Sequence, residues 1–146
     1  MPTQHINTAE LSMRSPEAVK WEICDRWLRR ADVDLAVAEQ LLADGVPYFV
    51  AIGFHAQQAA EKYLKAFLVW RQVEFPKTHD LGYLLQLLGT QDKGVSQSLQ
   101  QILVLSDYGV DTWYPANLPD LSSTEASHAV DLAKQTNDTI VKSLSS

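Results

Sequence analysis

The segment from about Tyr48 to Gln72 constrains the possible folds more than any other part of the chain. It has no internal proline and is rich in Ala, Leu, Gln, Glu and Lys, which favour helix. Its apolar side chains recur at helical spacing, but they cover a wide arc of the helix surface instead of a single stripe. Such a helix needs neighbours on more than one side, so we predict a central helix in an α-helical protein.

Amphipathic patterns on both sides of this segment predict further helices. Ser15-Pro16 suits an N-cap followed by proline at the first helical position, and the first helix should end near Asp44-Gly45. No alternating strand pattern of useful length occurs. The remaining patterns predict a short leucine-striped helix that opens at 78–80, a fourth helix over 95–108, and a last helix that follows a capping-box sequence at 122–125.

Together these elements predict a single domain. At 146 residues, the chain is long enough to bury a sizeable core without disulfide or metal staples. We therefore expect an all-α, up-down bundle of about five helices. Residues 1–14 are expected to be a flexible N-terminal segment, and residues 15–146 the helical domain.

Composition and charge exclude several classes of function. The formal charge is −6, from 12 basic and 18 acidic side chains, so nucleic acid could be attracted only by a local basic patch. Cys24 is the only cysteine, which excludes an internal disulfide and a thiolate metal cluster. No apolar run approaches the ~20 residues of a membrane span, and residues 1–10 lack the pattern of a secretory signal. We therefore expect a cytoplasmic protein without membrane contact.

A polar strip on the predicted central helix is the first candidate site. His55, Gln58, Lys62 and Lys65 follow one another at steps of three and four, which places them along one face. Glu61 lies beside this strip and precedes Lys65 by four residues, the favourable order for an ion pair. The strip could bind a phosphate, a nucleotide or a partner. It could equally be a solvated helix face with one salt bridge.

A second candidate lies at the predicted start of the third helix, in the sequence Lys77-Thr78-His79-Asp80. Backbone N–H groups at a helix N-terminus suit an anion, and Lys77 and His79 could add side-chain donors. However, Thr78 and Asp80 also serve as capping residues, and Asp80 would repel a phosphate. Both interpretations remain open from the residues alone.

Signals for catalysis by a metal or an activated nucleophile are missing from the sequence. The four histidines have no short metal-ligand spacing, and no HExxH, GxSxG, GxGxxG or Walker-type motif occurs. Cys24 falls on the apolar stripe of the first helix, where a buried and inert thiol is expected. We therefore expect neither a metal nor a cofactor.

Two motifs and a dipeptide identify a family resemblance. They are Phe54-His55-Ala56-Gln57-Gln58-Ala59-Ala60-Glu61-Lys62-Tyr63-Leu64-Lys65-Ala66, then Pro76-Lys77-Thr78-His79-Asp80-Leu81, then Tyr114-Pro115. In combination they resemble the HEPN domain family of prokaryotic helical proteins, over roughly residues 22–144. The resemblance implies a bundle of four to five helices, in agreement with the periodicity.

The function that the resemblance implies is less uniform. Many HEPN proteins pair with a small nucleotidyltransferase encoded beside them, as two-component or toxin–antitoxin systems, while others are ribonucleases and some are taken to bind nucleotides. The ribonucleases resemble one another in carrying an arginine, four to six intervening residues and a histidine late in the fold. This sequence departs from that pattern, because no arginine follows Arg71 and seven residues separate Arg71 from His79. Trp113 also stands where close relatives often show an arginine before Tyr-Pro.

The leading hypothesis is a non-catalytic or partner-dependent HEPN protein. It would bind a nucleotide or RNA and a small nucleotidyltransferase in a toxin–antitoxin-like system. One alternative is a ribonuclease toxin with a non-standard active site, for which His79 and His55 are the candidate catalytic residues. Another is a purely structural dimerisation module. The candidate ligand-binding residues are His55, Gln58, Glu61, Lys62, Lys65, Lys77, His79, Asp80 and Tyr114.

A homodimer is expected under each hypothesis. The apolar arc of the central helix is too wide for one neighbour, so part of it could be covered by a second chain. Tryptophan side chains offer large surfaces that could be buried between subunits. The sequence holds four of them, Trp21, Trp27, Trp70 and Trp113.

Overall fold

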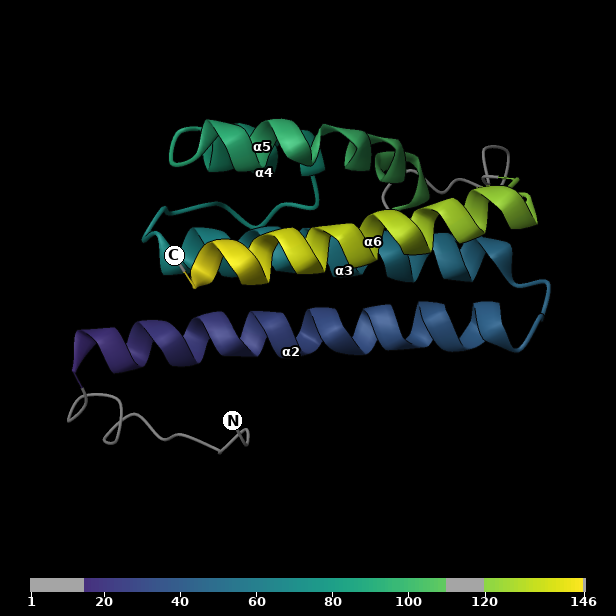
Figure 1. Ribbon diagram of the computed structural model, residues 1–146, viewed down its shortest axis with the longest axis horizontal. Helices are drawn as coiled ribbons and strands as arrows, with labels where there is room; N and C mark the ends of the chain where they lie inside the picture. The colour runs from purple at the N-terminus through teal and green to yellow at the C-terminus, as the bar shows by residue number, and fades with distance from the viewer. Residues whose placement is uncertain (1–14, 110–119, 146) are drawn as a thin grey trace.

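The computed structural model describes residues 15–109 and 120–145, and these residues form an all-α bundle (Figure 1). Its element order confirms the predicted fold class and the positions of the long helices. The described elements are α2 (Pro16–Ala43), α3 (Phe49–Trp70), α4 (Leu81–Gly89), α5 (Lys93–Ser98), the 3₁₀ helix η1 (Gln100–Tyr108) and α6 (Ser123–Leu144). The predicted N-terminal segment 1–14 lies outside the described residues.

Local signals set the bounds of α2. The Ser15 side chain accepts a hydrogen bond from the Ala18 N–H at 3.2 Å, and Pro16 occupies the first helical position. At the other end, Gly45 adopts a φ of +68°, a backbone conformation that residues with a side chain rarely adopt. This turn reverses the chain, so α3 runs antiparallel to α2 (Figure 1).

The helix α3 is the centre of the bundle. It packs against α2, α6, α4 and η1, so its wide apolar arc is covered by neighbours within the same chain. The predicted central helix is therefore confirmed, and the arc does not itself require a second subunit. Its fully buried apolar side chains are Ile52, Ala56, Ala59, Ala60, Tyr63, Leu64, Ala66, Phe67 and Leu68.

The fourth predicted helix, over 95–108, is instead divided into α5 and η1. Asp92 caps α5 by accepting from the Val95 N–H at 3.0 Å, so the helix begins earlier than predicted. Beyond α5, buried side chains recur every third residue, which matches the three residues per turn of a 3₁₀ helix. These buried residues are Leu99, Ile102, Leu105 and Tyr108.

The last helix, α6, begins at the predicted capping box. Ser122 Oγ accepts from the Glu125 N–H, and Glu125 Oε1 accepts from the Ser122 N–H, both at 3.1 Å. The segment from α4 to η1 carries the chain back along the bundle, so α6 runs in the same direction as α3 (Figure 1). Among the described helices, none is long and apolar enough to cross a membrane.

Three of the four tryptophans pack against aromatic rings of the same chain. Trp21 packs edge-on against Trp70 at 5.7 Å between ring centroids, and Trp27 packs against Phe75 at 6.3 Å. Both contacts join α2 to the C-terminal end of α3 or to the segment that follows it. These three tryptophans thus make contacts within the chain and stay partly exposed, whereas Trp113 lies outside the described residues.

Candidate functional site

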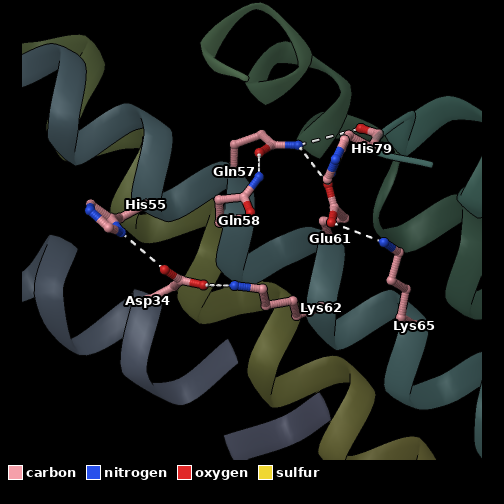
Figure 2. A network of polar contacts seen from close by, with 8 residues as sticks. All are labelled: Asp34, His55, Gln57, Gln58, Glu61, Lys62, Lys65 and His79. Atoms are coloured by element: carbon pink, nitrogen blue, oxygen red, sulfur yellow. Dashed lines mark hydrogen bonds and ion pairs between the residues drawn. The ribbon is translucent and has the colours of Figure 1, made fainter. Parts of the chain in front are cut away.

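Two carboxylates organise the polar side chains on α3 (Figure 2). Asp34 reaches them from α2, and Glu61 belongs to α3 itself. Both are buried, and Glu61 is only 1% exposed. A buried carboxylate is costly unless cations and hydrogen-bond donors surround it, so these two groups dictate where the neighbouring side chains lie.

Asp34 holds one histidine and one lysine. Its Oδ1 lies 3.0 Å from His55 Nδ1, and its Oδ2 forms an ion pair with the Lys62 ammonium. The side chains of His55 and Lys62 remain 29% and 22% exposed. Asp34 thus fixes both donors at the surface between α2 and α3, where each keeps contact with solvent.

Glu61 holds a second histidine and a second lysine. Its Oε1 lies 2.9 Å from His79 Nδ1, and its Oε2 accepts from the Lys65 ammonium at 3.1 Å. Gln57 Nε2 adds a longer contact to Oε1 at 3.4 Å. The His79 side chain is 57% exposed, so it covers a buried carboxylate with an accessible imidazole ring.

Gln57 connects this cluster to neighbouring segments. Its side-chain amide Nε2 lies 3.5 Å from the His79 carbonyl oxygen, and its Oε1 accepts from Gln58 Nε2 at 2.7 Å. A Cβ built on Gly109, at the end of η1, would lie 3.6 Å from Gln57 Cδ. Gln57 therefore ties α3 to the His79 backbone and packs beside Gly109.

Lys65 is part of the interior and does not offer a free surface charge. Its ammonium is bound to Glu61 and lies 5.2 Å from the Trp27 ring centroid and 5.9 Å from that of Phe75. The residue is buried, in contrast to Lys62. The helical spacing placed both lysines on one strip, but only Lys62 has an exposed side-chain edge there.

The predicted helix-start cluster is only partly joined to this network. Lys77 is exposed and has no hydrogen bond or ion pair among the described residues. Asp80 is the N-cap of α4, accepting from the Tyr83 N–H at 3.1 Å, as the capping interpretation predicts. His79 instead belongs with Glu61. The candidate residue Tyr114 lies outside the described residues.

Two members of the network were missed from the sequence, Asp34 and Gln57. Asp34 follows the buried Ala31 by three residues and immediately precedes the buried Leu35. A carboxylate at the border of an apolar stripe is a signal for a buried ion pair, and it could have been recognised. Gln57 gives no such signal, because its role depends on where the chain places the His79 carbonyl.

Other reactive groups do not form a second site in the described part of the chain. Cys24 is fully buried, and burial raises the pKa of its thiol to about 12, so it stays protonated near neutral pH. No cluster of three or more His, Cys, Asp or Glu side chains suited to a metal occurs among residues 15–109 and 120–145.

Comparisons with known proteins agree with this architecture. The family model described as HEPN domain matches residues 24–144. The crystal structure of TT1696 from Thermus thermophilus is similar, with a TM-score of 0.65 and 28% sequence identity. The match covers 82% of this chain and 96% of that chain. No significant match is found among curated protein sequences.

Exchange of Lys65 for methionine should destabilise the fold more than the same exchange at Lys62. Loss of Lys65 leaves the buried Glu61 without its ammonium partner, and breaking such a pair costs about 3 kcal/mol. Lys62 is more exposed, so we expect a loss of about 1 kcal/mol or less for Lys62→Met. Urea unfolding of both variants measures the difference.

The double variant Lys65→Met/Glu61→Gln is the control for this prediction. It removes both charges, so it should recover part of the stability lost in Lys65→Met. Equal losses for the two single variants would show that the burial of Lys65 has no energetic consequence.

Proposed function

The chain belongs to the HEPN domain family, and on this basis we propose that it is a non-catalytic member that binds a nucleotide or RNA phosphate. The proposed site is the α3 polar cluster, defined as Asp34, His55, Lys62, Glu61 and His79 together with Lys77, which precedes His79 by two residues. A small nucleotidyltransferase is the proposed partner, in a two-component system of the toxin–antitoxin type, as the family resemblance implies.

The carboxylate-anchored donors carry this proposal. Asp34 and Glu61 each bind the Nδ1 side of a histidine, so both imidazoles are oriented before any ligand arrives. Both rings keep an exposed edge, and Lys62 and Lys77 are cations with solvent contact. Cations with solvent contact beside oriented rings suit a phosphate group, because little ordering is required on binding.

The charge balance of the cluster favours a compact phosphate over a long polyanion. Lys62 compensates Asp34, and Lys65 compensates Glu61. Among the described residues, Lys77 is the lysine of the proposed site that is not paired with a carboxylate. The net charge of the whole chain is −6. A long nucleic acid would therefore meet a repulsive field beyond the cluster, whereas a nucleotide or an RNA end would contact only the local donors.

Substitution of Lys62 by alanine should weaken phosphate-ligand binding. The loss of one charge-assisted hydrogen bond is expected to cost about 1–3 kcal/mol of binding free energy. Calorimetric titration with ATP, GTP and a short single-stranded RNA, at low and moderate salt, measures this change. A matched control is Lys134→Ala, which removes an exposed lysine from α6.

The two variants distinguish a local site from a general charge effect. A local site predicts weaker binding for Lys62→Ala and unchanged binding for Lys134→Ala. Equal affinities for wild type and both variants, or no binding by wild type, would contradict ligand binding at the cluster. A purely structural dimerisation module would then be the better interpretation.

A ribonuclease remains the second candidate, because of the Glu61–His79 pair. An accessible imidazole held by a buried carboxylate is a known arrangement for proton transfer. However, catalysis of RNA cleavage also needs a cation for the developing phosphorane charge, and no arginine follows Arg71 in the sequence. The lysines of the site supply only a point charge in place of the forked guanidinium. We therefore place binding ahead of cleavage.

The purified protein should leave single-stranded RNA intact in the absence of a partner. Gel analysis of a labelled RNA after prolonged incubation measures cleavage, with His79→Ala as the matched variant. If wild type cuts the RNA and a folded His79→Ala variant does not, the ribonuclease interpretation is correct and the non-catalytic proposal is wrong.

We also propose that the protein is a homodimer, as expected for this family. The helix α2 carries two exposed apolar side chains, Ile23 and Val33, which a second copy could cover. Light scattering at micromolar concentration should therefore give about twice the 16.3 kDa mass of one chain. A monomer mass across this concentration range would reject the dimer.

A further inference from the structure

Among the three described histidines, only His79 has a ring that both contacts a buried carboxylate and is highly exposed. Its Nδ1 lies 2.9 Å from the buried Glu61 Oε1, yet the side chain is 57% exposed. His55 has a similar carboxylate contact but is about half as exposed. His128, on α6, is exposed and has no carboxylate contact among the described residues.

The contact with Glu61 decides which ring nitrogen of His79 is reactive. Glu61 already accepts a hydrogen bond from the Lys65 ammonium, so its carboxylate acts as an acceptor and Nδ1 must carry the proton that it receives. The hydrogen bond made by one ring nitrogen sets the tautomer of the other. In the neutral imidazole the Nε2 atom of His79 then carries the lone pair, and it has no hydrogen-bond partner among the described residues.

We propose that His79 Nε2 is a nucleophile that accepts a phosphoryl group from an energy-rich phosphate donor. Histidine forms covalent intermediates of this kind when a neighbouring group orients and activates the ring. Glu61 provides that orientation, and Gln57 fixes the backbone of His79 through its carbonyl oxygen. This inference is independent of nucleotide binding, since it needs neither a nucleotide nor a partner protein.

The reaction balances with phosphoramidate as the donor. The Nε2 lone pair attacks phosphorus, a P–N bond to the imidazole forms, and the donor's own P–N bond breaks. The ring gives up its Nδ1 proton to Glu61, which returns it to water, and the departing ammonia takes a proton from water on the Nε2 side and leaves as ammonium. The product is a neutral imidazole phosphorylated on Nε2.

The surroundings of His79 tolerate the added phosphoryl charge. Glu61 is compensated by Lys65, and the exposed Lys77 is only two residues away in the chain. The Asp80 carboxylate is nearby, but it is engaged by the Tyr83 N–H at the start of α4. The local balance of fixed charges therefore does not oppose a phosphoryl group as strongly as the net charge of the chain suggests.

The test compares three histidines within one folded protein. The full chain is treated with potassium phosphoramidate, and the rate of phosphorylation at His79, His55 and His128 is measured by site-resolved mass spectrometry. We expect His79 to react at least about tenfold faster than His128, because only His79 combines an anchored tautomer with high exposure. Equal rates at His79 and His128 would overturn the proposal.

Two variants test the role of the carboxylate. In Glu61→Gln the amide cannot take the ring proton, so the His79 rate should fall to that of His128. An unchanged rate in a folded Glu61→Gln variant would also overturn the proposal. His79→Gln confirms the assignment of the modified site, and the wild-type rate ratio decides the question even if Glu61→Gln does not fold.

Discussion

The burial of α3 on several sides is the constraint on which the rest of the structure depends. Its apolar arc is covered by α2, α6, α4 and η1, and full burial of such side chains supplies most of the driving force for folding. Every polar group on α3 must therefore either reach the surface or find a partner inside. The polar cluster exists because α3 carries Glu61 in a position that its neighbours enclose.

The enclosed charges explain why residues of similar type have different roles. Lys65 is buried between Glu61 and two aromatic rings, and it stabilises the junction of α2 with the end of α3. Lys62, three residues earlier, pairs with Asp34 and keeps solvent contact. The same difference separates the histidines, since His79 is exposed about twice as much as His55. Position relative to the helix interfaces, and not residue type, thus selects the groups that are available to a ligand.

The preorganised donors connect the fold to its proposed function. Asp34 and Glu61 are costly to bury, and their cost is offset by histidines and lysines that become fixed in place. A cation fixed in place, such as Lys62, suits a phosphate ligand, and an oriented imidazole with an accessible ring nitrogen suits a nucleophile. Both proposals for the cluster follow from this one arrangement, yet they concern different chemistry of the ring nitrogens.

The sequence by itself determined the helices, most of their ends and the family. The caps Ser15 and Ser122 and the proline-free segment 48–72 act locally, so their effect is visible without the fold. Only the tertiary structure separated the buried Lys65 from the partly exposed Lys62 on the polar strip. The burial of Lys65 depends on Trp27 and Phe75, which are distant in sequence. It also divided the fourth helix into α5 and η1 and brought Asp34 and Gln57 into the site. Helical spacing shows which residues share a face, whereas packing between helices decides which part of that face meets water.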